Sequence, residues 1–270
     1  MNKLWEVTLE SKSIPKLNDP ILVEGLPGIG NVGKIAADFL VEELKAKKLY
    51  SFFSYRFPHS VFVNEKNLIE MPKLELYYKQ FGKGSRKKDF LFLTGDIQPI
   101  DEESCYAFCD EVLKIAKDHR CSYIITTGGI GLQQIPEKPL LYCTSNDPAL
   151  LAEYTKKGMP TEKEIFGVVG PIIGVSGILL GLGKKRGVKA VSLLAETFGN
   201  PLYLGIKGAK EIIHLLDKKF TLNLNLKKFS KDILEVENNL FQKAADWLGE
   251  EMPHAQAGAQ AKKKEAHYIG

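Results

Sequence analysis

A glycine-rich segment near the N-terminus has the residue types and the spacing of a phosphate-binding loop. In the stretch PILVEGLPGIGNVGKIAADFL (20–40), Gly28, Gly30 and Gly33 match the pattern G-x-G-x-x-G, while Gly28, Gly33 and Lys34 match G-x-x-x-x-G-K. An apolar run precedes the glycines and an amphipathic run follows them, so the loop would join a strand to a helix, as both patterns require. The free backbone N–H groups at the start of that helix would suit a phosphate.

The residues that would complete nucleotide chemistry are absent from both patterns. A dinucleotide site needs Asp or Glu at the end of the next strand to hold the ribose, but the chain reads FPHSVF (57–62) there. A phosphate loop needs Ser or Thr after its lysine to ligate magnesium, and Ile35 occupies that position. We therefore predict that the glycines serve a tight turn and close packing of a helix on a sheet, and that the protein uses no cofactor.

A second group of candidates lies where predicted strands end. TGD (94–96), TTGG (126–129) and ETFG (196–199) each follow an apolar strand. Because α/β sheets bind ligands outside the carboxyl ends of their strands, these residues would meet at one edge. The residues of this candidate pocket are Gly28, Gly30, Asp96, Gly128, Gly129 and Glu196.

The sequence does not reveal a nucleophile with its base. The hydrolase motif G-x-S-x-G does not occur, and Ser176 lies just inside a predicted helix. His119 and His214 fall near predicted helix C-termini, where a cation complements the helix dipole. Asp101 is expected to cap the following helix rather than to join a carboxylate pair. We predict no catalytic residue and no metal site.

The four cysteines, Cys105, Cys109, Cys121 and Cys143, form no C-x-x-C pair, so the usual zinc spacing is absent. Cys105 and Cys109 share one face of a predicted helix, and we expect the cysteines to behave as small buried apolar residues. The first residues, MNKLWEVTLESKS, contain no apolar signal-peptide core. We therefore expect a cytoplasmic protein with reduced thiols.

Composition limits the classes of partner. The 270 residues are 44% hydrophobic and 26% charged, which supports a sizeable core. The 37 basic and 33 acidic residues give a formal charge of +4; this excess is too small to predict nucleic-acid binding. No apolar run reaches the ~18 residues of a membrane span. The segment that comes nearest, 167–183, is interrupted by glycines and a proline.

Strands and helices alternate along the chain. Strands are expected at 21–26, 50–57, 89–96, 121–129, 140–145, 166–170 and 188–197, and helices at 31–48, 102–119, 146–157, 174–185, 202–220 and 229–251. Short alternating runs between 60 and 81 predict an antiparallel hairpin edge. Continuous apolar strands joined through helices predict an α/β fold, with a mainly parallel sheet covered by helices on both faces. We expect one domain over 1–248, ending in an amphipathic helix, and a flexible tail over 249–270.

Several of these stretches, taken in order, resemble a known family. They are LVEGLPGIGNVGKIAADFL, FLFLTGDIQP, IITTGGIG, VVGPIIGVSGILLGLGKKRGV and LLAETFG. As a set, they are similar to archaeal members of the proteasome assembly chaperone family, related to its second eukaryotic chaperone, over about residues 18–245. The resemblance implies a phosphorylase/hydrolase-like α/β fold without established catalytic chemistry. It also implies homo-oligomers that bind the α subunits of the proteasome core particle.

The family's binding element is a C-terminal tail that ends hydrophobic–Tyr–any residue and enters pockets between α subunits. This chain ends AHYIG, with its tyrosine third from the end. The resemblance therefore implies that the partner-binding residues are His267, Tyr268, Ile269 and Gly270. Self-association is also expected from the apolar segments 52–63 and 170–183.

Two alternatives to a binding protein follow from the same residues. One is an enzyme of the nucleoside phosphorylase or hydrolase type, using the candidate pocket at the strand ends. The other is a regulator that binds a nucleotide through Gly28–Lys34.

Overall fold

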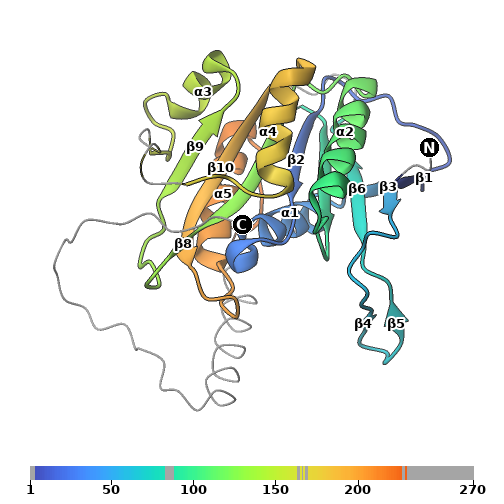
Figure 1. The fold of residues 1–270 in the computed structure, drawn as a ribbon. Coiled ribbons are helices and arrows are strands. Elements are labelled where there is room, and N and C mark those ends of the chain that lie inside the picture. Colours follow the sequence, from blue (N-terminus) through green and yellow to red (C-terminus); the bar gives the residue numbers. More distant parts are fainter. Residues whose placement is uncertain are drawn as a thin grey trace, which may run out of the picture.

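The computed structural model describes residues 4–82, 88–162, 165, 167, 170–226 and 229. An eight-stranded sheet runs through the centre of the molecule, in the order β1-β3-β6-β7-β2-β8-β10-β9 (Figure 1). Its strands are β1 (Glu6–Leu9), β2 (Ile21–Gly25), β3 (Lys47–Phe53), β6 (Leu74–Lys79), β7 (Phe90–Gly95), β8 (Tyr123–Leu132), β9 (Leu141–Ser145) and β10 (Ala190–Phe198).

The central strands β7, β2, β8 and β10 are mutually parallel. Every residue of β2 and β7 is buried, because strands covered on both faces must be apolar on both. The predicted α/β class, with its parallel strands between two layers of helices, is confirmed. Antiparallel pairing extends beyond the expected hairpin: β1, β3 and β6 add to one side of the parallel group, and β9 adds to the other.

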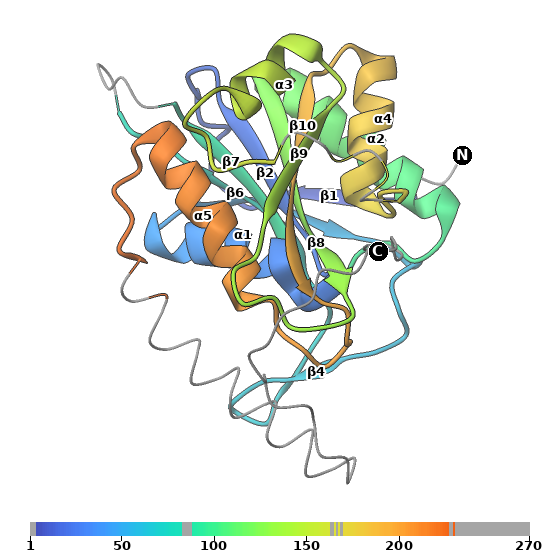
Figure 2. The ribbon, with the colours of Figure 1, turned by 90° about the vertical axis from the view of Figure 1, so that its left-hand side faces the viewer.

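Two pairs of helices cover the two faces of the sheet (Figure 2). On one face α1 (Val32–Glu43) packs beside α5 (Ile206–Phe220), and their apolar residues join the core that contains Val23 and Phe92. On the other face α2 (Glu102–Asp118) packs beside α4 (Val175–Arg186), over the core that contains Leu22 and Leu93. The short helix α3 (Pro148–Thr155) lies against β9.

Two helices, α2 and α3, begin at capping residues in the sequence. The Asp101 side chain accepts a hydrogen bond from the Ser104 N–H at 2.9 Å, which confirms the predicted cap of α2. Asp147 caps α3 in the same way, accepting a hydrogen bond from the Leu150 N–H at 2.8 Å. Helix α1 ends before the expected residue 48, because Lys45 adopts a left-handed φ of 51° and β3 begins at Lys47.

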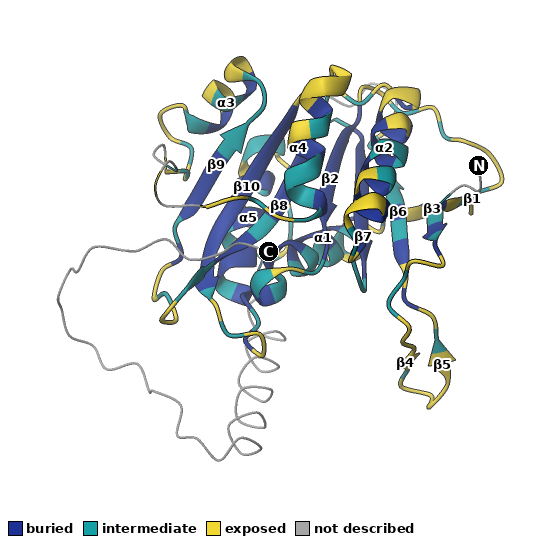
Figure 3. Cartoon of the chain, viewed as in Figure 1, coloured by how far each residue is buried: buried dark blue, intermediate teal, exposed yellow. Residues whose placement is uncertain are grey.

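A hairpin arm, defined here as residues 55–71, projects from the body of the molecule (Figure 1). Its strands β4 (Phe62–Val63) and β5 (Ile69–Glu70) form a separate two-stranded sheet. Figure 3 colours most of the arm as exposed, and its exposed residues include the large apolar residues Tyr55, Val63 and Ile69. The apolar residues of α4 lie mainly in the core instead. Of the two segments expected to self-associate, 52–63 therefore carries most of the exposed apolar surface, and 170–183 contributes the exposed Ile173, which precedes α4.

Some predictions fall outside the described residues. They include the helix expected over 229–251, apart from Phe229, and the tail over 249–270. Most of the strand expected over 166–170 also lies outside them. The division of the chain into one domain over 1–248 and a tail stays a prediction. Phe229 itself is buried and packs edge-on against Phe39, with ring centroids 4.9 Å apart.

Candidate functional site

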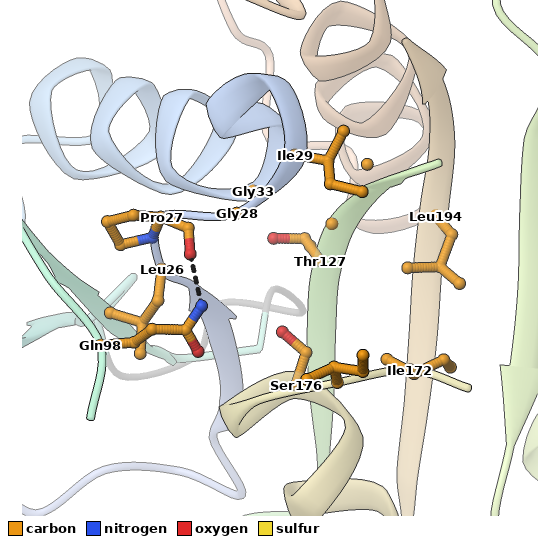
Figure 4. Close-up of a pocket in the computed structure, with 13 residues that line it drawn as sticks. Leu26, Pro27, Gly28, Ile29, Gly33, Gln98, Thr127, Ile172, Ser176 and Leu194 are labelled. Carbon is orange, nitrogen blue, oxygen red and sulfur yellow. Dashed lines mark hydrogen bonds between the residues drawn. The ribbon is translucent and has the colours of Figure 1, made fainter. Parts of the chain in front are cut away.

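The four parallel strands place a crevice at the centre of the sheet. In chain order they are β2, β7, β8 and β10, but in space β2 lies between β7 and β8. The connections therefore reverse direction between β2 and β8, and open α/β sheets bind ligands outside the carboxyl ends of strands at such a switch point. A cavity lies there, with a volume of about 20 Å³ (Figure 4).

Most of the residues that line this switch-point cavity come from three parts of the chain. The loop after β2 contributes Leu26–Ile29, β8 contributes Thr127–Gly129, and the approach to α4 contributes Ile172, Ile173 and Ser176. The remaining lining residues are Gly33, Gln98 and Leu194. A volume near 20 Å³ has room for about one water molecule. The cavity as it stands is far too small for a nucleoside.

The structure brings three of the six candidate pocket residues together. Gly28, Gly128 and Gly129 line the switch-point cavity. Whether the cavity binds a ligand stays a prediction.

The other three candidates have different surroundings. The carbonyl of Gly30 accepts a hydrogen bond from the Gly205 N–H at 2.7 Å. Asp96 accepts one from the Lys73 N–H at 3.1 Å. Glu196 is buried beside β9, where its carboxylate accepts a hydrogen bond from the Leu140 N–H at 3.0 Å.

The glycines of the loop allow very close packing of the backbone. A Cβ on Gly33 would lie 2.4 Å from the Thr127 carbonyl oxygen, and one on Gly129 would lie 2.3 Å from the Ile29 carbonyl oxygen. Gly30 has a left-handed φ of 61°, which favours glycine. These constraints explain glycine at Gly30 and Gly33, the second and third glycines of the G-x-G-x-x-G pattern.

Lys34 is engaged away from the position of a phosphate-binding lysine. Its Nζ lies 3.0 Å from Asp38 Oδ2, one turn further along α1, and 3.6 Å from Asp96 Oδ1. The strand after α1 is also misplaced for a dinucleotide site, because β6 and β7 separate β3 from β2. The side chain of Ile35 packs on the core between α1 and α5.

Glu24, which sequence reasoning missed, lies beneath the cavity. Its side chain is fully buried, and the Ser176 hydroxyl donates a hydrogen bond to its Oε2 at 2.9 Å. The Leu26 N–H donates to Oε1 at 3.2 Å. Burial raises the pKa of Glu24 to about 7, against the lowering effect of these hydrogen bonds. The available signal was a carboxylate inside the apolar strand ILVEG, directly before the glycine loop.

Glu24 belongs to a polar row on the face of the sheet that α2 and α4 cover. Thr126 on β8 is its register neighbour, and Ser192 on β10 is the neighbour of Thr126. Both hydroxyls are buried and make no hydrogen bond to any protein atom in the described part of the chain. Buried polar atoms are normally satisfied, so this row is an unusual feature of the core.

Gln98 fixes the mouth of the cavity from the side of β7. Its Nε2 donates to the Pro27 carbonyl at 2.7 Å (Figure 4), and its Oε1 accepts from the Val175 N–H at 3.3 Å. The loop after β2 and the first residue of α4 are thereby tied to one side chain. Figure 4 shows the hydroxyls of Thr127 and Ser176 directed towards the side of that loop and away from Leu194, and each donates a hydrogen bond to Glu24.

The remaining candidates for chemistry lie elsewhere. Cys105, Cys109 and Cys143 are buried, as expected, and all four cysteines are free. His119 ends α2, and burial lowers its pKa. Among the residues that the structure describes, no three metal-ligating side chains come together, and no helix is long and apolar enough to cross a membrane.

Comparison with known proteins shows that the chain is similar to members of one protein family. The sequence model of the PAC2 family matches residues 22–243. The crystal structure of Pyrococcus furiosus PbaB, described as an archaeal proteasome activator, is 30% identical, with a TM-score of 0.79 over 90% of this chain and 99% of that one. P. furiosus PbaA, described as an archaeal homolog of proteasome-assembly chaperone, is 24% identical, with a TM-score of 0.69 over 90% and 93%. An uncharacterized protein of Methanocaldococcus jannaschii is 26% identical over 98% of this chain and 97% of its own length.

Proposed function

The chain belongs to the PAC2 family, and from that premise we propose that it binds the proteasome core particle as an assembly chaperone or activator. The observation that carries this proposal is the similarity to the proteasome activator PbaB, which extends over 90% of this chain and 99% of PbaB. The sequence motifs, which resemble the proteasome assembly chaperone family, indicated the same family. The finer elements of the proposal are the contact with α subunits, the use of the tail and the homo-oligomer.

This role depends on binding surfaces rather than on turnover of a substrate. The alternative of a nucleoside phosphorylase or hydrolase loses support, because the switch-point cavity holds about 20 Å³. The alternative of a nucleotide-binding regulator also loses support, since Lys34 pairs with Asp38 and Asp96.

The proposed contact with the α subunits uses His267–Gly270, which lie outside the described residues. Tyr268 combines an apolar ring with a hydroxyl and is a good anchor at modest entropic cost. The preceding residues from about 249 to 265 are rich in Ala, Gln, Lys and Gly and would serve as a tether. In a homo-oligomer each copy carries such a tail, so several weak contacts would combine through effective concentration.

Native mass spectrometry of the full chain, alone and mixed with purified core particle, tests the proposal. We expect a complex of the two, and its absence at micromolar concentrations would overturn the proposed function. Tyr268→Ala and removal of residues 268–270 should each weaken binding about tenfold or more, as expected for the loss of an anchor residue. His254→Ala, in the proposed tether, is the matched control and should bind like the parent. If every variant binds equally, the contact comes from the globular body and the role of the tail is wrong.

A further inference from the structure

We propose that Ser176 and Glu24 form a nucleophile–base pair that accepts a short acyl group from an activated ester, with the carbonyl oxygen in the switch-point cavity. This inference goes beyond the proposed function, because binding to a proteasome requires neither side chain.

The pair has the geometry of an activated serine. The Ser176 hydroxyl donates to Glu24 Oε2 at 2.9 Å, within the 2.6–3.2 Å range expected of a nucleophile and its base. The Leu26 N–H holds the other carboxylate oxygen, Oε1, at 3.2 Å and so orients the base. Ser176 is only partly buried and lines the cavity, whereas Glu24 lies fully buried beneath it.

The surroundings of Glu24 favour proton transfer near neutral pH. Burial raises its pKa to about 7, where a general base works most effectively. From α2, the thiols of Cys105 and Cys109 face it. The hydrogen bond between the two thiols and burial raise the pKa of Cys109, and the same bond, which stabilises the Cys105 thiolate, lowers the pKa of Cys105. From β8, the Thr127 hydroxyl donates to the Glu24 backbone carbonyl at 2.8 Å, and a hydrogen bond from the Thr127 backbone lowers the pKa of the Glu24 carboxyl.

The cavity suits a carbonyl oxygen on which negative charge develops. Its volume of about 20 Å³ admits one water-sized atom. Ser176 is the second residue of α4, a helix of 12 residues. The Val175 N–H is already bonded to Gln98 Oε1, so the first-turn N–H groups without a partner in their own helix that remain for the oxyanion are those of Ser176 and Gly177. They lie at the positive end of the helix dipole, which stabilises an oxyanion. Apolar walls from Ile172 and Leu194 limit access of water and strengthen these interactions.

The size of the cavity sets the class of substrate. Gly28 and Ile173 line it and are exposed, so a substrate can reach it from this rim. A two-carbon acyl group adds little beyond the carbonyl, whereas a longer chain would meet Ile172 and Leu194. We therefore assign short-chain activated esters, such as acetyl esters with a good leaving group.

The reaction is a balanced acyl transfer. Ser176 Oγ forms a bond to the acyl carbon while its proton moves to Glu24 Oε2. The bond to the leaving group breaks, and the departing alkoxide takes that proton. Water then attacks the acyl-serine as Glu24 accepts its proton, and the proton passes to Ser176 Oγ as the carboxylic acid departs.

The test treats the full chain with p-nitrophenyl acetate and locates acetyl groups by peptide mass spectrometry. We expect acetylation of Ser176, with a rate that rises about tenfold per pH unit below pH 7 and then levels off. Glu24→Gln should lower the rate at Ser176 about 100-fold or more, while surface lysines, which also react with this ester, act as the internal reference. Ser122→Ala, at an exposed serine outside the cavity, should leave Ser176 unaffected. p-Nitrophenyl butyrate should react at least tenfold more slowly than the acetate.

Three results would overturn the assignment. They are the absence of acetyl on Ser176 in samples quenched with acid before the acyl-serine can hydrolyse, an equal rate in Glu24→Gln, and a rate without an inflection near pH 7. If Glu24→Gln fails to fold, which a thermal melt would show, the pH profile of the parent protein decides alone.

Discussion

At the scale of single residues, the ionised form of Glu24 that would act as a base is also the form that destabilises the folded protein. Burial raises its pKa from 4.5 to about 7, whereas in the unfolded chain the carboxyl titrates at its ordinary value. The folded state therefore binds the proton more tightly. The stability that this provides is complete below about pH 4.5 and is lost as the pH rises to about 7, since the folded protein must then hold a buried charge.

Comparison of the parent protein with Glu24→Gln isolates this effect. Glutamine keeps an accepting oxygen for Ser176 or Leu26 and cannot ionise. Between pH 4.5 and 7 the parent should lose roughly 3 kcal/mol of unfolding free energy relative to the variant, the equivalent of the pKa difference. Urea unfolding at a series of pH values measures it. Stability curves that stay parallel over this interval would contradict the raised pKa.

Substitutions at Gly30 and Lys34, two residues of the segment 28–34, should have very different effects on stability. Gly30→Val should cost about 3 kcal/mol or more, because φ is 61° and a Cβ would lie 2.8 Å from Thr197 Oγ1. Lys34→Ala removes only partly exposed ion pairs with Asp38 and Asp96 and should cost less than about 1 kcal/mol. Thermal or urea unfolding compares the two. Equal losses would show that the loop is not under the packing constraint described above.

At the scale of elements, the sequence pattern predicted those features that depend on nearby residues, such as strands and helix starts. The continuous apolar runs predicted the central strands, and Asp101 predicted the start of α2. Strand order depends on pairing between distant segments, so the position of β3 beyond β6 and β7 could not be read from the sequence. The pairing of Glu24 with Ser176 joins residues 152 positions apart and was invisible for the same reason.

The loop between β2 and α1 should bind neither ATP nor NAD appreciably. Ile35 stands at the magnesium-ligand position, Lys34 is held by carboxylates, and β3 is too distant to offer a ribose contact. Isothermal titration with each nucleotide, with and without magnesium, should give no heat of binding at micromolar concentrations. Micromolar affinity for either one would favour the nucleotide-regulator alternative.

At the scale of the whole molecule, the hairpin arm is a projection with exposed apolar side chains. At its base, Phe57 packs against Trp5 with ring centroids 5.6 Å apart, and Arg56 pairs with Glu103 at 3.2 Å. At its tip, Asn64 Oδ1 accepts a hydrogen bond from the Leu68 N–H at 3.1 Å. An isolated two-stranded hairpin is marginally stable in water. A well-formed arm with exposed apolar side chains therefore fits a contact with another molecule.

We predict that this arm contributes to self-association of the chain. Val63 and Ile69 are paired across β4 and β5 and are 67% and 73% exposed, so they offer adjacent apolar side chains to a second copy. The parent protein should sediment as an oligomer at micromolar concentration, and the double variant Val63→Glu/Ile69→Glu should shift towards the 30.1 kDa monomer. Lys66→Glu, on the connecting turn, is the control for added negative charge and should remain oligomeric. Because both apolar side chains are exposed, the monomeric double variant should retain the helical content of the parent by circular dichroism. A parent that sediments as a monomer, or a double variant that remains oligomeric, would show that the arm does not join copies of this chain, and its apolar surface would then have to meet a different protein.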